Sequence, residues 1–393
     1  MLYCPQQEHS MIRPFSLEVP RTILFGCGQR KSIPELLAPY GARVLLVSGS
    51  RWLKDSGRLA QLMGLLPRLQ VLTLSCPGGE PTSEGLEELL AEARGYRPQA
   101  VLAVGGGSVL DTAKAVSALL PLSERVDDFL EGGGAGLRVQ KPGLPWIAVP
   151  TTAGTGAEVT QNAVIRSLAR GVKRSIRSPH LLAAAVVVDP ELTLDCPLSL
   201  SGMAGLDALA QQIESFVSRK ARPVPRALVR DAFPLLLRCL QAIPERPGDL
   251  EARGGASYGA MISGIALANS GLGAAHGLAS GLGGMYDIPH GLICALALRP
   301  VLRLNAPLIG PDIELLVREA RQEQAGRGEA VEWLEAKIGE LLQRYRLPAD
   351  LKGFGIDADL AEEIARRSSG SSMSGNPREL SLEERKDLLL SLL

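Results

Sequence analysis

The sequence predicts a two-domain protein in which an α/β domain is followed by an all-helical domain. Between residues 22 and 189, short apolar runs rich in Val, Ile and Leu alternate with helical stretches. This alternation is typical of a doubly wound, mostly parallel sheet with helices on both faces. From Ser199 onward, long patterns rich in Ala, Leu and Arg predict helices only. A chain of 393 residues is also long for a single hydrophobic core.

We place the boundary between the two domains near Cys196, so that residues 1–196 form the α/β domain and residues 197–393 the helical domain. Runs such as RVLLV and AVLAV are apolar almost throughout, as in strands that are buried on both faces. The main strands are expected at Thr22–Phe25, Arg43–Val47, Gln70–Leu74, Ala100–Val104, Pro145–Val149 and Ala184–Val188. Helices of the second domain are expected at Ser199–Ser218, Pro225–Ala242, Ala252–Asn269, Ile288–Asn305, Gly310–Gln324, Ala330–Tyr345 and Leu360–Ser368.

Charge and composition exclude several classes of partner. Lys+Arg and Asp+Glu both number 42, so the chain has no formal net charge. Nucleic acids and anionic membranes require a basic surface, and we expect neither as a partner. No apolar run reaches the roughly 18 residues of a membrane span, and the N-terminus lacks the apolar core of a signal peptide. The six cysteines are scattered without a CxxC pair, as reduced thiols are, so we expect a cytoplasmic protein.

A glycine-rich turn follows the strand that ends at Val104. The sequence there is GGGSVLDTAK, beginning with Gly105, Gly106 and Gly107. Ser108 and Asp111, three residues apart, are expected to form a capping box at the start of a helix. Glycines before such a cap leave backbone N–H groups accessible at the positive end of the helix dipole, which predicts a phosphate-binding site. The alternative is an ordinary tight turn between a strand and a helix.

A second candidate loop follows the strand that ends at Val149. It reads PTTAGTGAEVT and is rich in hydroxyls and small residues. Ligands of open α/β sheets bind at the carboxyl ends of the strands, where such residues suit a ribose, a pyrophosphate or a carboxamide. The alternative is a Thr-rich turn that leads into another strand.

The segment Gly271–Gly291 contains two of the four histidines of the whole chain, His276 and His290. Histidine is the commonest side-chain metal ligand. Apolar residues on both sides of the segment indicate buried helices, with a glycine-rich crossover between the two histidines. The histidines therefore either bind a metal or are buried and hydrogen-bonded, and the segment by itself does not favour one alternative.

The first helix of the second domain carries Asp207 and Gln211 at positions i and i+4, which share one face. Small residues flank them on that face, as they do on a face that packs against another element. The carboxylate, the amide oxygen of Gln211 and the imidazoles of His276 and His290 make a four-ligand metal site with an open position for a substrate oxygen. Without the histidines, a merely polar helix face would be the better interpretation of this pair.

Together these segments resemble the iron-containing (group III) alcohol dehydrogenase family, which includes lactaldehyde/propanediol oxidoreductases and butanol dehydrogenases. The matching motifs are GGGSVLDTAKA, PTTAGTGAEVT, GLDALAQQIES and HGLASGLGGMYDIPHG, with Asn376-Pro377-Arg378 near the C-terminus. They span nearly the whole chain in the family's order. The resemblance implies the architecture shared with dehydroquinate synthase, with an α/β nucleotide-binding domain and a helical metal- and substrate-binding domain.

The resemblance also implies the reaction and the site. We expect hydride transfer between NAD(P) and a small alcohol or its aldehyde or ketone, assisted by one divalent metal, Fe²⁺ or Zn²⁺, in a homodimer or higher homo-oligomer. The metal ligands correspond to Asp207, Gln211, His276 and His290, of which Asp207, His276 and His290 are the catalytic residues. The expected cofactor residues are Gly49, Gly105, Gly106, Gly107, Ser108, Asp111, Thr151, Thr152, Thr155, Thr160, Asn162, Lys173 and Leu192.

Two departures from the family concern the metal site. Members usually have histidine where Gln211 stands, and the amide oxygen is a harder ligand that is expected to bind zinc less tightly. Members also commonly have a second histidine four residues after His276, where this chain has Ser280. Water or the cofactor ribose must then carry the proton. The loss of both histidines keeps open a metal-free reductase resembling maleylacetate reductase, and the shared architecture keeps open a lyase resembling dehydroquinate synthase.

A third departure concerns the cofactor. The strand that ends at Val47 is often followed by an Asp that binds the adenosine ribose, and Gly49 stands there. Without that carboxylate a 2′-phosphate is tolerated, and Ser50 and Arg51 can donate to it, so we expect a preference for NADP. In the alternative, Glu80 occupies the ribose pocket and NAD is preferred.

Overall fold

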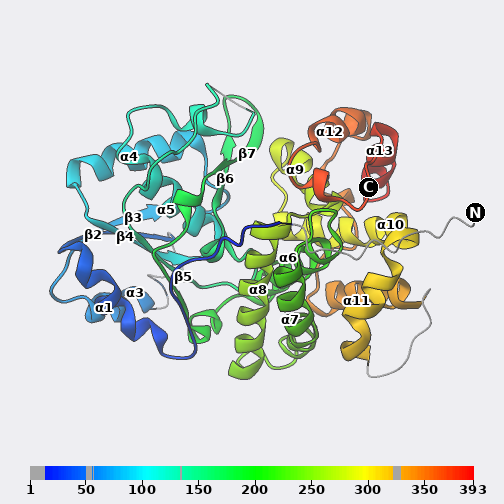
Figure 1. The fold of residues 1–393 in the computed structure, drawn as a ribbon, viewed down its shortest axis with the longest axis horizontal. Coiled ribbons are helices and arrows are strands. Elements are labelled where there is room, and N and C mark those ends of the chain that lie inside the picture. Colours follow the sequence, from blue (N-terminus) through cyan, green and yellow to red (C-terminus); the bar gives the residue numbers. More distant parts are fainter. Residues whose placement is uncertain (1–13, 50–54, 56, 133–134, 322–328) are drawn as a thin grey trace, which may run out of the picture.

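The computed structural model describes residues 14–49, 55, 57–132, 135–321 and 329–393. Figure 1 shows an α/β half beside a helical half, with the first helix of the second half, α6 (Leu198–Val217), at their junction. This arrangement confirms the predicted fold class. The domain boundary at Cys196 remains a prediction. The predicted roles of Ser50 and Arg51 fall outside the described residues.

A six-stranded parallel sheet forms the core of the first half, in the order β1-β8-β5-β4-β2-β3. Its strands are β1 (Ile23–Phe25), β2 (Arg43–Gly49), β3 (Gln70–Cys76), β4 (Ala100–Gly105), β5 (Trp146–Pro150) and β8 (Ala185–Val188). The helices of this half are α1 (Ile33–Leu37), α3 (Arg58–Leu65), α4 (Ser83–Tyr96) and α5 (Gly107–Leu119). Alternate residues of β2 belong to two different hydrophobic clusters, one under α4 and α5 and one under α1 and α3. The strand is therefore buried on both faces, as its apolar sequence predicts.

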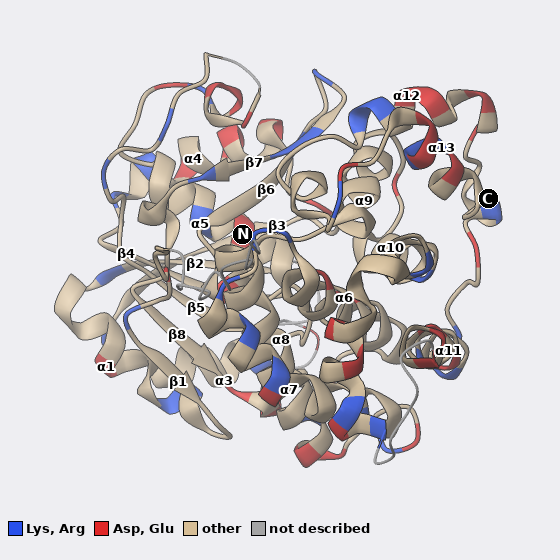
Figure 2. Ribbon diagram, turned by 45° about the vertical axis from the view of Figure 1, so that its right-hand side comes forward, with Lys and Arg blue, Asp and Glu red and all other residues tan. Residues whose placement is uncertain are grey.

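The second half consists of helices packed around α6. They are α7 (Pro223–Ala242), α8 (Leu250–Ser270), α9 (Ala274–Met285), α10 (His290–Arg321), α11 (Glu329–Arg344), α12 (Ala361–Arg367) and α13 (Leu382–Leu390). Acidic and basic residues are interspersed on both halves, most densely along α11 to α13 (Figure 2). This mixture agrees with the zero formal net charge of the chain.

Three elements differ from the sequence-based prediction. An antiparallel hairpin of β6 (Asn162–Ser167) and β7 (Val172–Arg177) lies outside the main sheet, where the short polar strands gave little signal. The predicted break after Asn305 is wrong, because α10 continues past its internal prolines. Its apolar face is buried on both sides of the predicted break, and this packing outweighs the usual cost of a helical proline.

The glycine-rich crossover predicted between the two histidines is mostly helix α9. Glycine is a poor helix former, so the sequence argued against a helix here. The structure shows why glycines are needed: a Cβ on Gly277 would lie 2.6 Å from Met373 Cε, and one on Gly281 would lie 2.3 Å from Ser368 Oγ. Close packing of α9 against the C-terminal segment replaces the missing helix propensity.

Helix α10 is long and apolar enough to cross a membrane by length and composition. However, 61% of its most apolar window is buried inside the protein. Core helices of this kind pass the same test, so α10 is explained by its packing in the helical half.

The two halves meet where the loop after β5 touches α6 and α8. A Cβ on Gly154 would lie 2.7 Å from Ala204 Cβ on α6. A Cβ on Gly264, in α8, would lie 2.3 Å from the carbonyl oxygen of Gly156. Only glycines allow backbones to approach this closely. The loop is therefore pressed directly onto the helix that carries Asp207.

We expect Gly264→Ala to lower the free energy of unfolding by about 1–3 kcal/mol, because the new methyl group collides with backbone and the junction must open. Gly254→Ala is the matched control in the same helix, where the nearest atom to the new Cβ is Pro190 Cγ at 3.9 Å. That variant should be unchanged or more stable by up to about 1 kcal/mol. Guanidinium unfolding measures both, and equal effects of the two substitutions would contradict the close junction.

Candidate active site

Helix α6 places Asp207 in the interior of the protein. One stripe of the helix, including Leu206, Leu209 and Ile213, is almost completely buried in the core. Asp207 lies beside this stripe and its side chain is 2% exposed. A buried carboxylate is costly unless it is paired or binds a cation. The surroundings of Asp207 therefore determine what this site can do.

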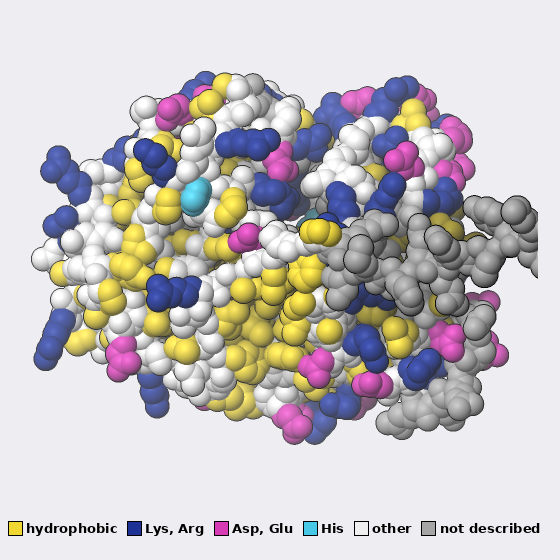
Figure 3. All heavy atoms as spheres, in the orientation of Figure 1, with side chains coloured by type: hydrophobic (Ala, Val, Ile, Leu, Met, Phe, Trp, Pro, Cys, Tyr) yellow, Lys and Arg dark blue, Asp and Glu magenta, His cyan; other side chains and the backbone are white. Residues whose placement is uncertain are grey.

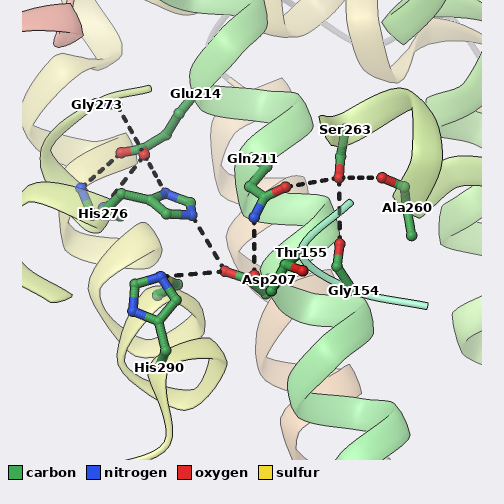
Figure 4. A network of polar contacts seen from close by, with 12 residues as sticks. Gly154, Thr155, Asp207, Gln211, Glu214, Ala260, Ser263, Gly273, His276 and His290 are labelled. Carbon is green, nitrogen blue, oxygen red and sulfur yellow. Dashed lines mark hydrogen bonds and ion pairs between the residues drawn. The ribbon is translucent and has the colours of Figure 1, made fainter. Parts of the chain in front are cut away.

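The two histidines lie at the N-terminal ends of two helices. His276 lies in the first turn of α9, and His290 is the first residue of α10. His276 Nε2 lies 3.3 Å and His290 Nε2 4.0 Å from Asp207 Oδ1. Figure 4 shows both imidazoles on the same side of the Asp207 carboxylate. The structure thus brings together the three residues that the sequence predicts to be catalytic.

A fourth side chain in this cluster was not predicted. Cys294 follows His290 by one helical turn of α10, and its Sγ lies 3.5 Å from His290 Nε2. The ligand atoms of Asp207, His276, His290 and Cys294 all lie within 4.8 Å of one another. The i, i+4 spacing of His290 and Cys294 was the available signal, and it was overlooked because the six cysteines were interpreted only as scattered thiols.

Several polar atoms of the cluster have no partner. Asp207 Oδ1, His276 Nε2 and His290 Nδ1 are buried without a hydrogen bond to any described part of the chain. Unpaired buried polar atoms are costly, and the first two face each other across 3.3 Å. A cation between them would satisfy both, so these residues fit a metal ion.

Gln211 lies on the other side of Asp207. Its Nε2 donates to Asp207 Oδ2 over 2.9 Å, and its Oε1 accepts from Ser263 Oγ over 2.8 Å. Figure 4 shows the amide pointing away from the two imidazoles. Gln211, which the sequence predicts to be a metal ligand, therefore holds the carboxylate of Asp207 in position. Its amide oxygen is hydrogen-bonded to Ser263 of α8.

Glu214 is a buried residue of the site that the sequence-based interpretation missed. Its carboxylate accepts from the backbone N–H groups of Gly273 and Ala275 at the start of α9, and it lies 2.7 Å from His276 Nδ1. This contact directs His276 Nε2 toward Asp207. Acidic partners of this kind commonly orient metal-binding imidazoles.

The pKa values of Asp207 and His290 favour the forms that bind a metal, an ionised carboxylate and a neutral imidazole. Burial, with the charge of Lys173, lowers the pKa of His290 to about 3, so this imidazole is neutral. Burial alone would raise the pKa of Asp207, but the neighbouring imidazoles of His276 and His290 lower it overall. Burial opposes protonation of His276, yet Cys294 and Asp207 raise its pKa well above the usual value. A metal must therefore displace a proton from His276.

The two predicted cofactor loops lie side by side at the carboxyl edge of the sheet. Gly105 and Pro150 are paired neighbours in β4 and β5. A Cβ on Gly107 would lie 2.7 Å from Thr155 Oγ1, and one on Gly106 would lie 3.3 Å from Thr152. The hydroxyl-rich loop thus closes over the glycine turn. The backbone N–H of Thr151 also donates to the carbonyl of Gly105.

The predicted capping box at Ser108 is wrong. Helix α5 starts two residues earlier than predicted, at Gly107, with Gly106 as its N-cap and no side-chain cap among the described residues. An extended Gly106 begins the helix before Ser108 can cap it. The first N–H groups of α5 therefore remain available to a phosphate, as the glycine turn predicts. Asp111 instead accepts from the backbone N–H of Val164.

A buried lysine links the loops below this edge. Lys114 Nζ donates to Asp111 Oδ1, Thr160 Oγ1 and the carbonyl oxygen of Asn162. The side chain of Lys114 is fully buried and Thr160 is 2% exposed. Asn162 Oδ1, in contrast, is a buried acceptor without a partner in the described chain. Asp111 and Thr160 therefore hold Lys114 beneath the carboxyl edge of the sheet, whereas the side-chain oxygen of Asn162 is available to accept a hydrogen bond from a ligand.

Lys173 lies on β7 and faces the helical half. A Cβ on Gly283 of α9 would lie 3.5 Å from its Nζ, and its charge lowers the pKa of His290. Lys173 forms an ion pair with Glu80. Glu80 is thus paired with a lysine that faces the metal cluster. This pairing argues against the alternative in which Glu80 binds the adenosine ribose.

A cavity of about 190 Å³ lies near Leu192, on the face of the sheet covered by α1 and α3. Val104 and Val149, at the ends of β4 and β5, form one wall, and Lys31 lies at the margin. Ser48 pairs with Val104, so the end of β2 lies beside this wall, although a Cβ on Gly49 itself would point toward Val109 on the other face of the sheet. Basic and polar residues that also line the cavity are Arg30, Arg58 and Gln61.

Comparison with known proteins agrees with this geometry. Residues 20–190 match the family described as iron-containing alcohol dehydrogenase, and residues 201–393 match its C-terminal domain. The chain is 31% identical to a lactaldehyde reductase of Escherichia coli strain K12, over 92% of this chain and 95% of the relative. It is 29% identical to an NADPH-dependent butanol dehydrogenase of Clostridium saccharobutylicum, over 94% and 96% of the two chains.

A solved structure of a 1,3-propanediol oxidoreductase superposes with a TM-score of 0.90 at 27% identity, covering 97% of this chain and all of the other. The family uses NAD(P) and a divalent metal, which the glycine turn and the cluster around Asp207 are suited to bind. The chain belongs to the iron-containing alcohol dehydrogenase family and is an NAD(P)-linked oxidoreductase that interconverts an alcohol and its aldehyde or ketone.

Proposed function

We propose that Asp207, His276 and His290 hold a catalytic divalent ion, Zn²⁺ or Fe²⁺, next to the bound nicotinamide. The observation that supports this most directly is that Asp207 Oδ1 and His276 Nε2 are buried, face each other and lack partners in the described structure. The loop at Gly154 packs on α6 one turn before Asp207. The cofactor loops and the metal ligands therefore converge on one site.

The protein's own groups then orient the reactants. A bound divalent ion supplies a Lewis acid for the substrate oxygen, and the nicotinamide supplies the hydride chemistry. His290 is the most accessible of the three ligands, with a side chain 29% exposed against 2% for Asp207 and 4% for His276. The substrate reaches the site from the His290 side. Ser280 lies one turn after His276, so water or the cofactor ribose carries the proton.

The cofactor is placed along the carboxyl edge of the sheet. The bare N–H groups at the start of α5, beginning with Gly107, bind the pyrophosphate. The unpaired Oδ1 of Asn162 and the Nζ of Lys173 bind the nicotinamide end. The apolar walls of the cavity at Leu192 accept the flat adenine ring.

NADP is the preferred cofactor in this proposal. Gly49 offers no carboxylate to repel a 2′-phosphate, and Lys31 at the adjacent cavity brings a cation to that region. The related butanol dehydrogenase is NADPH-dependent. The substrate is a small aliphatic alcohol or aldehyde, of the chemistry that the names of the lactaldehyde, butanol and propanediol relatives indicate.

We also propose a cytoplasmic homodimer or higher homo-oligomer. Apolar side chains that are 37–41% exposed include Phe15, Val19, Phe25, Leu200 and Leu250. Figure 3 shows hydrophobic side chains gathered at the centre of one face of the molecule, over the helical half near its junction with the sheet. Among the described residues, β1 pairs only with β8, so its other edge could accept a strand of a second copy. The five described cysteines are free, as expected in a reducing compartment.

His276→Ala should reduce bound metal from one ion per chain to a small fraction and abolish most activity, since it removes one ligand of the buried site. Nucleotide binding should persist because the cofactor loops are untouched. The control is His180→Ala, a histidine in the α/β half that leaves the cluster intact. Elemental analysis and nucleotide titration measure the two effects. Full metal content in His276→Ala would refute the site, and full activity of metal-free wild-type protein would favour the metal-free alternative.

Gly49→Asp should shift the cofactor preference toward NAD. Among the described residues, a Cβ at Gly49 would meet Val109 Cγ2 at an ordinary contact distance of 3.8 Å, so a side chain can leave the backbone there without a close contact. Repulsion of the 2′-phosphate should lower the ratio of kcat/KM for NADPH to that for NADH by about tenfold or more. Gly95→Asp, near the end of α4, adds the same charge at an open position and should leave the ratio unchanged. An unchanged ratio in Gly49→Asp would show that this position does not reach the ribose.

A further inference from the structure

Cys294 occupies the place in the cluster where a fourth metal ligand is needed. It is completely buried on α10, one helical turn after His290. Its Sγ lies 3.5 Å from His290 Nε2, and it is within 4.8 Å of the ligand atoms of Asp207 and His276. All four groups therefore surround one point in the interior.

We propose that the thiolate of Cys294, and not the amide of Gln211, is the fourth protein ligand of the metal. This inference rests on the proposed metal site and specifies its chemistry. It makes the site one of two imidazoles, one carboxylate and one thiolate. Gln211 is then a positioning residue that acts through Asp207.

The distances fit four protein ligands around one ion, to which the substrate oxygen would add as a fifth ligand. Zn–N and Zn–O bonds of about 2.0–2.1 Å imply that ligand atoms lie about 3.3–3.4 Å apart, and a Zn–S bond of about 2.3 Å implies about 3.6 Å between sulfur and nitrogen. The structure has 3.3 Å between His276 Nε2 and Asp207 Oδ1, and 3.5 Å between Cys294 Sγ and His290 Nε2. The distance of 4.0 Å from His290 Nε2 to Asp207 Oδ1 must shorten, as must any other pair near the 4.8 Å limit of the cluster.

The two oxygens of Asp207 separate the roles of its neighbours. The imidazoles face Oδ1, which lacks a hydrogen-bond partner in the described structure, whereas Gln211 donates to Oδ2. A rotation of the Gln211 amide by half a turn would place its Oε1 against Asp207 Oδ2, and both atoms are acceptors. The rotation would also break the hydrogen bond that Ser263 donates to Oε1. Cys294 needs no rearrangement to face the cluster.

A thiolate changes what the site prefers. The neutral thiol loses its proton to solvent when the metal binds, because a coordinating thiol is deprotonated. The thiolate and the carboxylate then neutralise the charge of a divalent ion, with two neutral imidazoles completing the set. Thiolates bind zinc and other soft ions better than they bind Mn²⁺ or Mg²⁺. We therefore expect a zinc-selective centre.

Cobalt substitution gives a direct readout that does not depend on activity. A thiolate bound to Co²⁺ produces an intense ligand-to-metal charge-transfer band in the near ultraviolet, whereas amide, carboxylate and imidazole ligands do not. Metal-depleted full-length protein is titrated with Co²⁺ and then with Zn²⁺. The wild-type protein should show the band at one equivalent, and Zn²⁺ should displace it.

Three variants assign the band. Cys294→Ala should lose it and bind Zn²⁺ at least about tenfold more weakly, since outer-shell losses alone cost about 10–100-fold. Cys239→Ala is the matched control, because Cys239 is a buried thiol on α7 whose removal creates a similar cavity. It should keep the band, and so should Gln211→Ala, even if the latter binds metal more weakly.

X-ray absorption of the zinc-loaded wild-type protein keeps the test independent of any variant that fails to fold. One sulfur at about 2.3 Å, with nitrogen and oxygen at about 2.0–2.2 Å, is expected. Stoichiometric metal without sulfur and without the cobalt band would overturn the thiolate assignment and leave the metal site standing. A wild-type protein that binds neither Co²⁺ nor Zn²⁺ would instead overturn the proposed metal site itself.

Discussion

The burial of one carboxylate organises this active site. Asp207 lies in the core of the helical half, where an isolated charge would be strongly destabilising. Each of its oxygens meets a different set of partners, with Gln211 on one and the two imidazoles toward the other. The incomplete pairing of the second oxygen leaves room for a cation. The rest of the helical half, including Glu214 behind His276, keeps these groups in place.

The second organising feature is the close contact between the two halves. The loop after β5 belongs to the edge of the sheet where we propose the cofactor, and its glycines allow it to lie directly on α6 and α8. A single loop therefore connects the proposed nucleotide site with the helix that carries Asp207. This close approach would let nucleotide and metal meet, because only small side chains and backbone lie at the contact.

Much of the architecture follows from the sequence. Apolar strands that alternate with helices predicted the parallel sheet, and the glycine turn and scarce histidines pointed to the two parts of the proposed site. Where the prediction was wrong, packing outweighed local preference. Helix α10 continues past three prolines, and α9 forms from a glycine-rich segment, because both bury large surfaces against neighbouring helices. The predicted cap at Ser108 was wrong for a local reason, because the helix begins two residues earlier, with Gly106 as its N-cap.

By itself the sequence determined the fold class, the family and the residue types available for metal and cofactor, because periodicity and motif order are local properties of the chain. Only the tertiary structure decided which of these residues share a site. In the tertiary structure the amide of Gln211 is hydrogen-bonded to Ser263, and Glu80 is paired with Lys173. Cys294 lies in the cluster with Asp207 and the two histidines. These outcomes depend on the direction in which each side chain leaves its helix or strand. That direction is fixed by packing between elements that are far apart in the sequence.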